Sequence, residues 1–162
     1  MMTDKQEILR KRLDKLHRHY AALEEYHGLI TELERQKDIY DPDVFQSLDG
    51  YERAALDAYL KRYSSLQDYL GAKVFPLLLE IAGIPADRMS RVLAMVEREG
   101  IIESLQDWIE LREIRNDLEH DYPDDLRAAL SALKICVSSF TKLEKYYRNT
   151  IEFPRENDAS TL

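Results

Sequence analysis

The amino-acid sequence predicts an all-helical protein without β-sheet, folded as an antiparallel bundle of four or five helices. Apolar side chains recur at steps of three and four residues over long stretches, which is the period of a helix packed along a neighbour. Only 5 Gly and 5 Pro interrupt the 162 residues, and no segment shows a convincing strand pattern. We therefore expect a single helical domain over residues 1–150, followed by a flexible tail over residues 151–162.

The first predicted helix runs from about residue 3 to residue 36. Its apolar stripe consists of Leu9, Leu13, Leu16, Tyr20, Leu23, His27 and Ile30. A histidine on such a stripe is more often packed in the core than bound to a metal, and we interpret His27 in that way. Residues 38–50 lose the pattern, and Pro42 and Gly50 indicate a connecting loop.

The second long helix is predicted to begin at a capping pair, because Asp49 and Glu52 have the three-residue spacing of a capping box. Pro76 lies inside this helix and is expected to kink or split it. Gly83 and Pro85 end the helix, and a shorter helix follows that stops at Gly100.

Ser104 and Asp107 have the spacing of another cap, and the helix that they open ends before Pro123. Asp124 and Asp125 then suit the start of a last helix, whose apolar stripe continues to residue 147. Cys136 lies among apolar residues of this stripe, so we interpret it as a small core residue rather than a reactive thiol.

Composition restricts the classes of protein that fit. The chain has one cysteine, a mixed-charge N-terminus and no apolar run of membrane-spanning length, so we expect a soluble, cytoplasmic protein. The formal net charge of −8 counts against a general nucleic-acid binder, which usually has a basic face. A local basic cleft stays compatible with this charge, because binding depends on where the charges lie.

One segment, residues 115–122, carries residue types suited to phosphodiester chemistry: an arginine and, five positions later, a histidine. The guanidinium of Arg115 can bind phosphate oxygens, and His120 titrates near neutral pH and can move a proton. RNA supplies its own nucleophile, the 2′-hydroxyl, so this chemistry needs no metal and no cofactor.

The spacing alone is weak evidence, because Arg12 and His17 have the same separation in the first helix. In helical projection Arg115 lies at the edge of an apolar stripe, where a charge must be paired or used. The structural alternative is an ion pair, either with Glu119 or with a carboxylate on another helix. Residues five apart also project about 140° apart, so Arg115 and His120 share a site only if the helix bends or ends, or if two copies pool their groups.

The pattern Arg115-Asn116-x-x-x-His120-x-Tyr122 resembles the signature of the HEPN superfamily, most closely that of the HepT-like toxins. Residues 108–114 and 62–73 also resemble that family. The resemblance implies a helical bundle that forms a homodimer with both motifs facing a shared cleft. It further implies metal-independent endoribonuclease activity, with Arg115 and His120 catalytic and Asn116 supporting.

The resemblance also implies a partner, a small nucleotidyltransferase antitoxin that adenylylates the motif tyrosine, here Tyr122. A second hypothesis is a non-catalytic subunit that binds nucleotide or substrate for such a nucleotidyltransferase, and a third is a helical oligomerisation protein in which Arg115 only forms an ion pair. Four basic residues of the second helix are candidates for an RNA path, although such residues more often simply face solvent: Arg53, Lys61, Arg62 and Lys73.

Overall fold

The computed structural model describes residues 1–121 and 124–156, except for the side chains of residues 120 and 121, and every regular element within these ranges is helical. The all-helical bundle predicted from the sequence is confirmed. In chain order the elements are α1 (Asp4–Gln36), α2 (Pro42–Ser47), α3 (Gly50–Tyr69), the π-helical segment η1 (Leu70–Val74), α4 (Phe75–Ile81), α5 (Met89–Arg98), α6 (Leu105–Asp121), α7 (Leu126–Ser138) and α8 (Phe140–Glu156).

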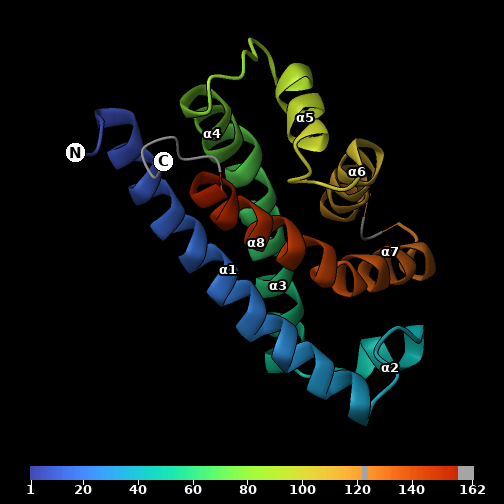
Figure 1. Ribbon diagram of the computed structural model, residues 1–162. Coiled ribbons are helices and arrows are strands. Elements are labelled where there is room, and N and C mark those ends of the chain that lie inside the picture. The colour runs from blue at the N-terminus through green and yellow to red at the C-terminus, as the bar shows by residue number, and fades with distance from the viewer. Residues whose placement is uncertain (122–123, 157–162) are drawn as a thin grey trace.

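The two long helices α1 and α3 lie side by side and antiparallel, and the other helices pack around them (Figure 1). Lys37, just after α1, binds Glu52 in the first turn of α3, whereas Arg12 near the start of α1 reaches the carbonyl of Lys73 at the far end. Helix α6 contacts α3, α5 and α7, on the side of the molecule away from α1 (Figure 1). Helix α3 is thus covered by α1 on one side and by α6 on another.

The predicted helix ends are confirmed where their capping chemistry is visible. Asp49 and Glu52 form a capping box at the start of α3. The Ser104 hydroxyl accepts a hydrogen bond from the Asp107 amide at 3.1 Å, at the start of α6. Gly100 follows α5 with φ of 77°, a left-handed conformation that favours glycine.

Pro76 disturbs the second long helix as predicted, and the form of the disturbance is a π turn. Residues Leu70–Val74 are wound as a π-helix directly before Phe75 and Pro76, and the chain then continues as α4. Proline lacks the N–H for the bond to residue 72, and its ring crowds that carbonyl. Widening the preceding turn accommodates the ring without ending the helix.

Three expectations from the sequence are wrong in detail. Residues Pro42–Ser47 form α2 within the expected loop, because Asp41 caps them and proline suits the first helical position. The expected single last helix is divided at Ser139, whose hydroxyl donates to the carbonyl of Ile135 at 2.6 Å. Helix α8 then continues to Glu156, with Phe153 5% exposed, so packing extends beyond residue 150, and residues 157–162 lie outside the described part of the chain.

The histidine predicted to pack on the apolar stripe of α1 does so. The His27 ring stacks on Phe140, with ring centroids 4.1 Å apart, and lies 6.0 Å from the ring of Tyr59. Burial lowers the pKa of His27 below its usual value, although Glu34, a Val137 backbone hydrogen bond and Glu144 act in the opposite direction. The neutral imidazole therefore belongs to the folded state.

This burial predicts a pH-dependent stability. Between its lowered pKa in the folded protein and its ordinary pKa near 6.5, His27 binds protons more readily in the unfolded chain, so its contribution is present at pH 7 and is lost as the pH falls. Replacing it by His27→Phe should increase the free energy of unfolding more at pH 5 than at pH 7. Urea denaturation at both pH values measures the difference, and an equal effect at both would contradict the assignment.

Candidate functional site

Arg115 is buried where α6 meets α3. The residue is 4% exposed. Its Nη1 donates to the carbonyl of Ser64 at 2.8 Å, and its Nη2 donates to Oδ1 of Asp68 at 2.5 Å. The predicted position at the edge of the apolar stripe is therefore confirmed, and the ion pair is the interhelical one of the two alternatives.

Glu119, the other expected partner of Arg115, binds elsewhere. Its carboxylate accepts a hydrogen bond from the Ser64 hydroxyl at 2.9 Å. Ser64 therefore contacts α6 twice, through its carbonyl to Arg115 and through its hydroxyl to Glu119. These bonds fix the register of α6 against α3 over one helical turn.

The Arg115–Asp68 pair is buried on one side only. The side chain of Arg115 is 5% exposed, whereas that of Asp68 is 58% exposed. The guanidinium is thus covered by a carboxylate that water can reach. Its Nε is buried and has no hydrogen-bond partner within the described residues. A guanidinium with N–H groups to spare and an exchangeable acceptor can accept an anion that displaces the carboxylate.

The inner side of Arg115 faces a core that contains several polar groups. Gln67 is 1% exposed and donates from Nε2 to the carbonyl of Trp108 at 3.1 Å. Within the described residues, neither Oε1 of Gln67 nor the hydroxyl of Tyr146 has a hydrogen-bond partner. Burial raises the pKa of Cys136 to about 12, with Arg115 acting in the opposite direction. The thiol is therefore a buried core group, as the sequence indicated.

The remaining motif residues are placed only in part. Asn116 is exposed, beside Arg115 on α6. The backbone of His120 belongs to the same helix, which runs without interruption from Leu105 to Asp121, so positions 115 and 120 project about 140° apart. Tyr122 lies outside the described residues. The catalytic pairing of Arg115 with His120 therefore stays a prediction.

The two basic residues singled out for RNA lie on the other side of α3, toward α1. Arg62 donates from Nη1 to Nδ1 of His19 at 3.3 Å, and the carbonyl of Lys73 accepts from Arg12 Nη1 at 2.7 Å. Ser64 and Asp68, by contrast, meet α6. Arg62 and Lys73 thus belong to a surface next to the Arg115 site, and their contact with RNA stays a prediction.

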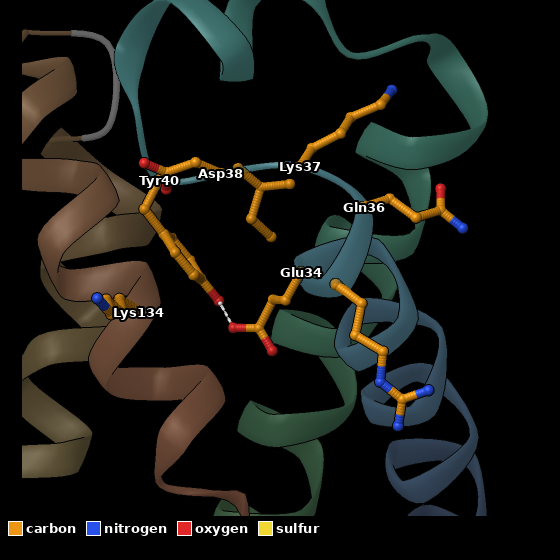
Figure 2. A pocket seen from close by; sticks show the side chains of 8 residues that line it. Glu34, Gln36, Lys37, Asp38, Tyr40 and Lys134 are labelled. Carbon is orange, nitrogen blue, oxygen red and sulfur yellow. Dashed lines mark hydrogen bonds between the residues drawn. The ribbon is translucent and has the colours of Figure 1, made fainter.

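Two hollows of the described surface lie away from Arg115. One, of about 470 Å³, lies between the end of α1 and α7, where the Tyr40 hydroxyl donates to Glu34 at 2.8 Å and Lys134 lies nearby (Figure 2). The other, of about 890 Å³, lies between the start of α1 and the end of α8. Neither hollow is lined by Arg115 or Asn116.

Two searches of the described residues gave negative results. No three His, Cys, Asp or Glu side chains in this part of the chain are close enough together to hold a metal ion. None of its helices is long and apolar enough to cross a membrane.

Comparisons with known proteins found no family model, no curated protein and no solved structure that matches this chain.

The burial of Arg115 predicts a specific pattern of stabilities. Asp68→Ala leaves a buried guanidinium without its carboxylate, and we expect a loss of about 2 kcal/mol, less than for a fully buried pair because water can replace the exposed Asp68. Replacing both groups, in Arg115→Met with Asp68→Ala, should recover most of that loss. Urea denaturation of each variant measures these changes.

Asp57→Ala provides the control, since Asp57 is an exposed aspartate on the same helix, and its replacement should cost less than about 0.5 kcal/mol. A loss for Asp68→Ala as small as that of the control, or no recovery in the double variant, would contradict the assignment of a structural ion pair.

Proposed function

We propose that this chain is a metal-independent endoribonuclease, the toxin of a toxin–antitoxin pair, which acts as a homodimer through residues 115–122. The observation that carries the proposal is how α6 presents this segment. Arg115 is fixed at the α3 contact beneath an exposed carboxylate, and its motif neighbour Asn116 faces outward. A fixed, partly screened arginine next to the exposed Asn116 suits the binding of an RNA phosphate.

In the proposed reaction the 2′-oxygen of RNA attacks the adjacent phosphorus, and His120 takes the proton of that hydroxyl. A bond forms between the 2′-oxygen and phosphorus, while the bond from phosphorus to the 5′-oxygen breaks and that oxygen takes a proton from an acid. The products are a 2′,3′-cyclic phosphate and a 5′-hydroxyl. Arg115 stabilises the negative charge that develops on the phosphoryl oxygens, and Asn116 helps to position them.

The helical geometry supports a site shared between two copies. Positions 115 and 120 lie about 140° apart around one continuous helix, so within a single chain the two motif positions fall on different sides of α6. A two-fold axis beside α6 would bring the arginine of each copy near the histidine of the other. The second histidine would then be available as the acid that protonates the leaving 5′-oxygen.

The proposed antitoxin is a small nucleotidyltransferase that transfers AMP to Tyr122. Tyr122 follows Arg115 by seven positions in the sequence. An added AMP would bring bulk and negative charge to the surface that receives RNA phosphates, and it would compete with them for Arg115.

A second candidate is a non-catalytic subunit that binds nucleotide or substrate for the nucleotidyltransferase. One observation favours it: both terminal nitrogens of Arg115 are already bonded, to Ser64 and Asp68, and the unpartnered Nε is buried, so the guanidinium is occupied in this conformation. This candidate predicts a stable complex with the nucleotidyltransferase and no cleavage of RNA by either protein.

Cleavage of RNA in the presence of a chelator tests the proposal. The purified protein should cut total RNA and leave 2′,3′-cyclic phosphate ends, and His120→Ala should lower the rate by about 100-fold or more, as loss of a general base does. His17→Ala is the matched control, because His17 has the same spacing from Arg12 and lies on α1, and this variant should cleave at the parent rate.

Equal cleavage by the parent and by His120→Ala would remove His120 from the mechanism. If neither cleaves, and mass spectrometry shows Tyr122 unmodified, the non-catalytic candidate replaces the proposal.

A further inference from the structure

Five basic side chains gather along the junction of α1 with α3 and η1. We call them the basic row: Arg12, Lys15, Arg18, Arg62 and Lys73. None of them forms an ion pair within the part of the chain that the structure describes, although acidic residues outnumber basic ones by 31 to 23. Arg10, close by on α1, does find a carboxylate, that of Asp14. Fifteen of the 23 basic residues form no ion pair in this part of the chain, so what distinguishes the row is that its cations lie together around two aromatic rings, Tyr69 and His19.

The basic row is an ordered arrangement. Arg12 is held by the carbonyl of Lys73 at 2.7 Å, and the Lys15 ammonium lies 5.2 Å from the ring centroid of Tyr69. Arg62 binds Nδ1 of His19 at 3.3 Å, and the His19 ring lies 5.5 Å from that of Tyr69. The antiparallel helices therefore bring these cations together around two adjacent rings, Tyr69 and His19.

The positive potential of the basic row is felt by the histidine at its centre. A guanidinium can only donate, so Nδ1 of His19 accepts and the imidazole is neutral. Burial lowers the pKa of His19, and the charges of Arg62, Lys15 and Arg18 lower it further. Among the described residues, no carboxylate offsets these positive charges at His19.

We propose that the basic row binds the phosphodiester backbone of a single-stranded nucleic acid, which is RNA if the proposed function holds. Proteins that bind single strands combine a line of cations with aromatic side chains, and Tyr69 and His19 supply the latter. A lipid surface fits less well: without these five cations the rest of the chain has a formal charge of −8 − 5 = −13, so a broad anionic sheet would meet repulsion on both sides. A single nucleic-acid strand is narrow enough to contact the basic row without meeting the acidic surface on either side.

The basic row also lies close to Arg115. On α3, Asp68 faces the Arg115 site and the adjacent Tyr69 faces α1. Adjacent residues of a helix point about 100° apart, so the Arg115 site and the basic row are separated by roughly 10 Å across the surface of α3. The surface between them carries the exposed Lys61 and the half-buried Ser65. A strand held on the row would therefore reach the Asp68 carboxylate within a few nucleotides.

The test measures binding of a fluorescent 12-nucleotide oligo(U) to the full chain carrying His120→Ala, which prevents cleavage. Lys15→Ala, Arg18→Ala and Arg62→Ala combined should weaken binding at least tenfold in 50 mM salt. The slope of log K against log salt should fall by about 2, because each lost phosphate contact removes about 0.7. Arg88→Ala, Arg91→Ala and Arg98→Ala combined form the matched control, with the same charge change at exposed positions near α5 and an expected effect within twofold.

Two further measurements distinguish a loss of phosphate contacts from a loss of folding. The double variant Lys15→Ala with Arg18→Ala leaves the Arg62–His19 bond intact and should still weaken binding several-fold, so misfolding cannot explain the result. In NMR titrations of the His120→Ala protein, oligo(U) should raise the pKa of His19, since phosphates offset the neighbouring cations.

The basic row is not a nucleic-acid site if both triple variants weaken binding equally, if oligo(U) fails to bind, or if poly-glutamate or phosphatidylserine vesicles bind in its place. If oligo(U) binding depends on the basic row but the protein cleaves no RNA, the proposed function is wrong and the assignment of the row as a nucleic-acid site stands. If the parent cleaves RNA but both triple variants bind oligo(U) equally, only the assignment of the row as a nucleic-acid site is wrong.

Discussion

The placement of α6 depends on a guanidinium that is almost entirely removed from water. A buried positive charge is tolerated only where a carboxylate and further acceptors surround it, and α3 supplies both through Asp68 and the carbonyl of Ser64. Sliding α6 by one residue would direct Arg115 away from these acceptors and leave it unpaired. The rest of the α3–α6 contact, including Glu119 with Ser64 and Gln67 with the Trp108 carbonyl, follows from this register.

Helix α3 consequently carries two chemically different surfaces. Toward α6 it presents the acceptors of Arg115, and toward α1 it presents Arg62 and Tyr69, which meet His19 and Lys15. Continuity of α3 through η1 into α4, in spite of Pro76, keeps Lys73 in line with these residues and lets Arg12 bind its carbonyl. The π turn therefore preserves the alignment of the basic row.

The sequence could predict the helices because their apolar period and their caps are local. Asp49 with Glu52 and Ser104 with Asp107 gave helix starts that the structure confirms. It could not predict the division of the last helix at Ser139, because the apolar stripe continues across that residue. Nor could it select Asp68 from 31 acidic residues as the partner of Arg115, since they lie 47 positions apart.

The basic row was missed for a similar reason. Arg12, Lys15 and Arg18 follow one another at three-residue steps, which is a signal of a shared helix surface, but only the pairing of α1 with α3 brings them to Arg62. Arg53 and Lys61, proposed beside Arg62 and Lys73, form no contact with the row: Arg53 donates to the carbonyl of Gln46 instead.

The two surfaces of α3 suggest a division of roles that reconciles an acidic chain with RNA as substrate. The charge of Arg115 is neutralised by Asp68, so the proposed catalytic region would itself attract phosphates weakly. In the proposed arrangement the basic row would supply the attraction and hold the strand at a distance of a few nucleotides. A phosphate delivered in this way need only displace the water-accessible Asp68 carboxylate from a guanidinium that Ser64 already holds in place. Such a donor requires little reorganisation when charge develops on the phosphate, which is the condition under which a buried arginine contributes most to catalysis.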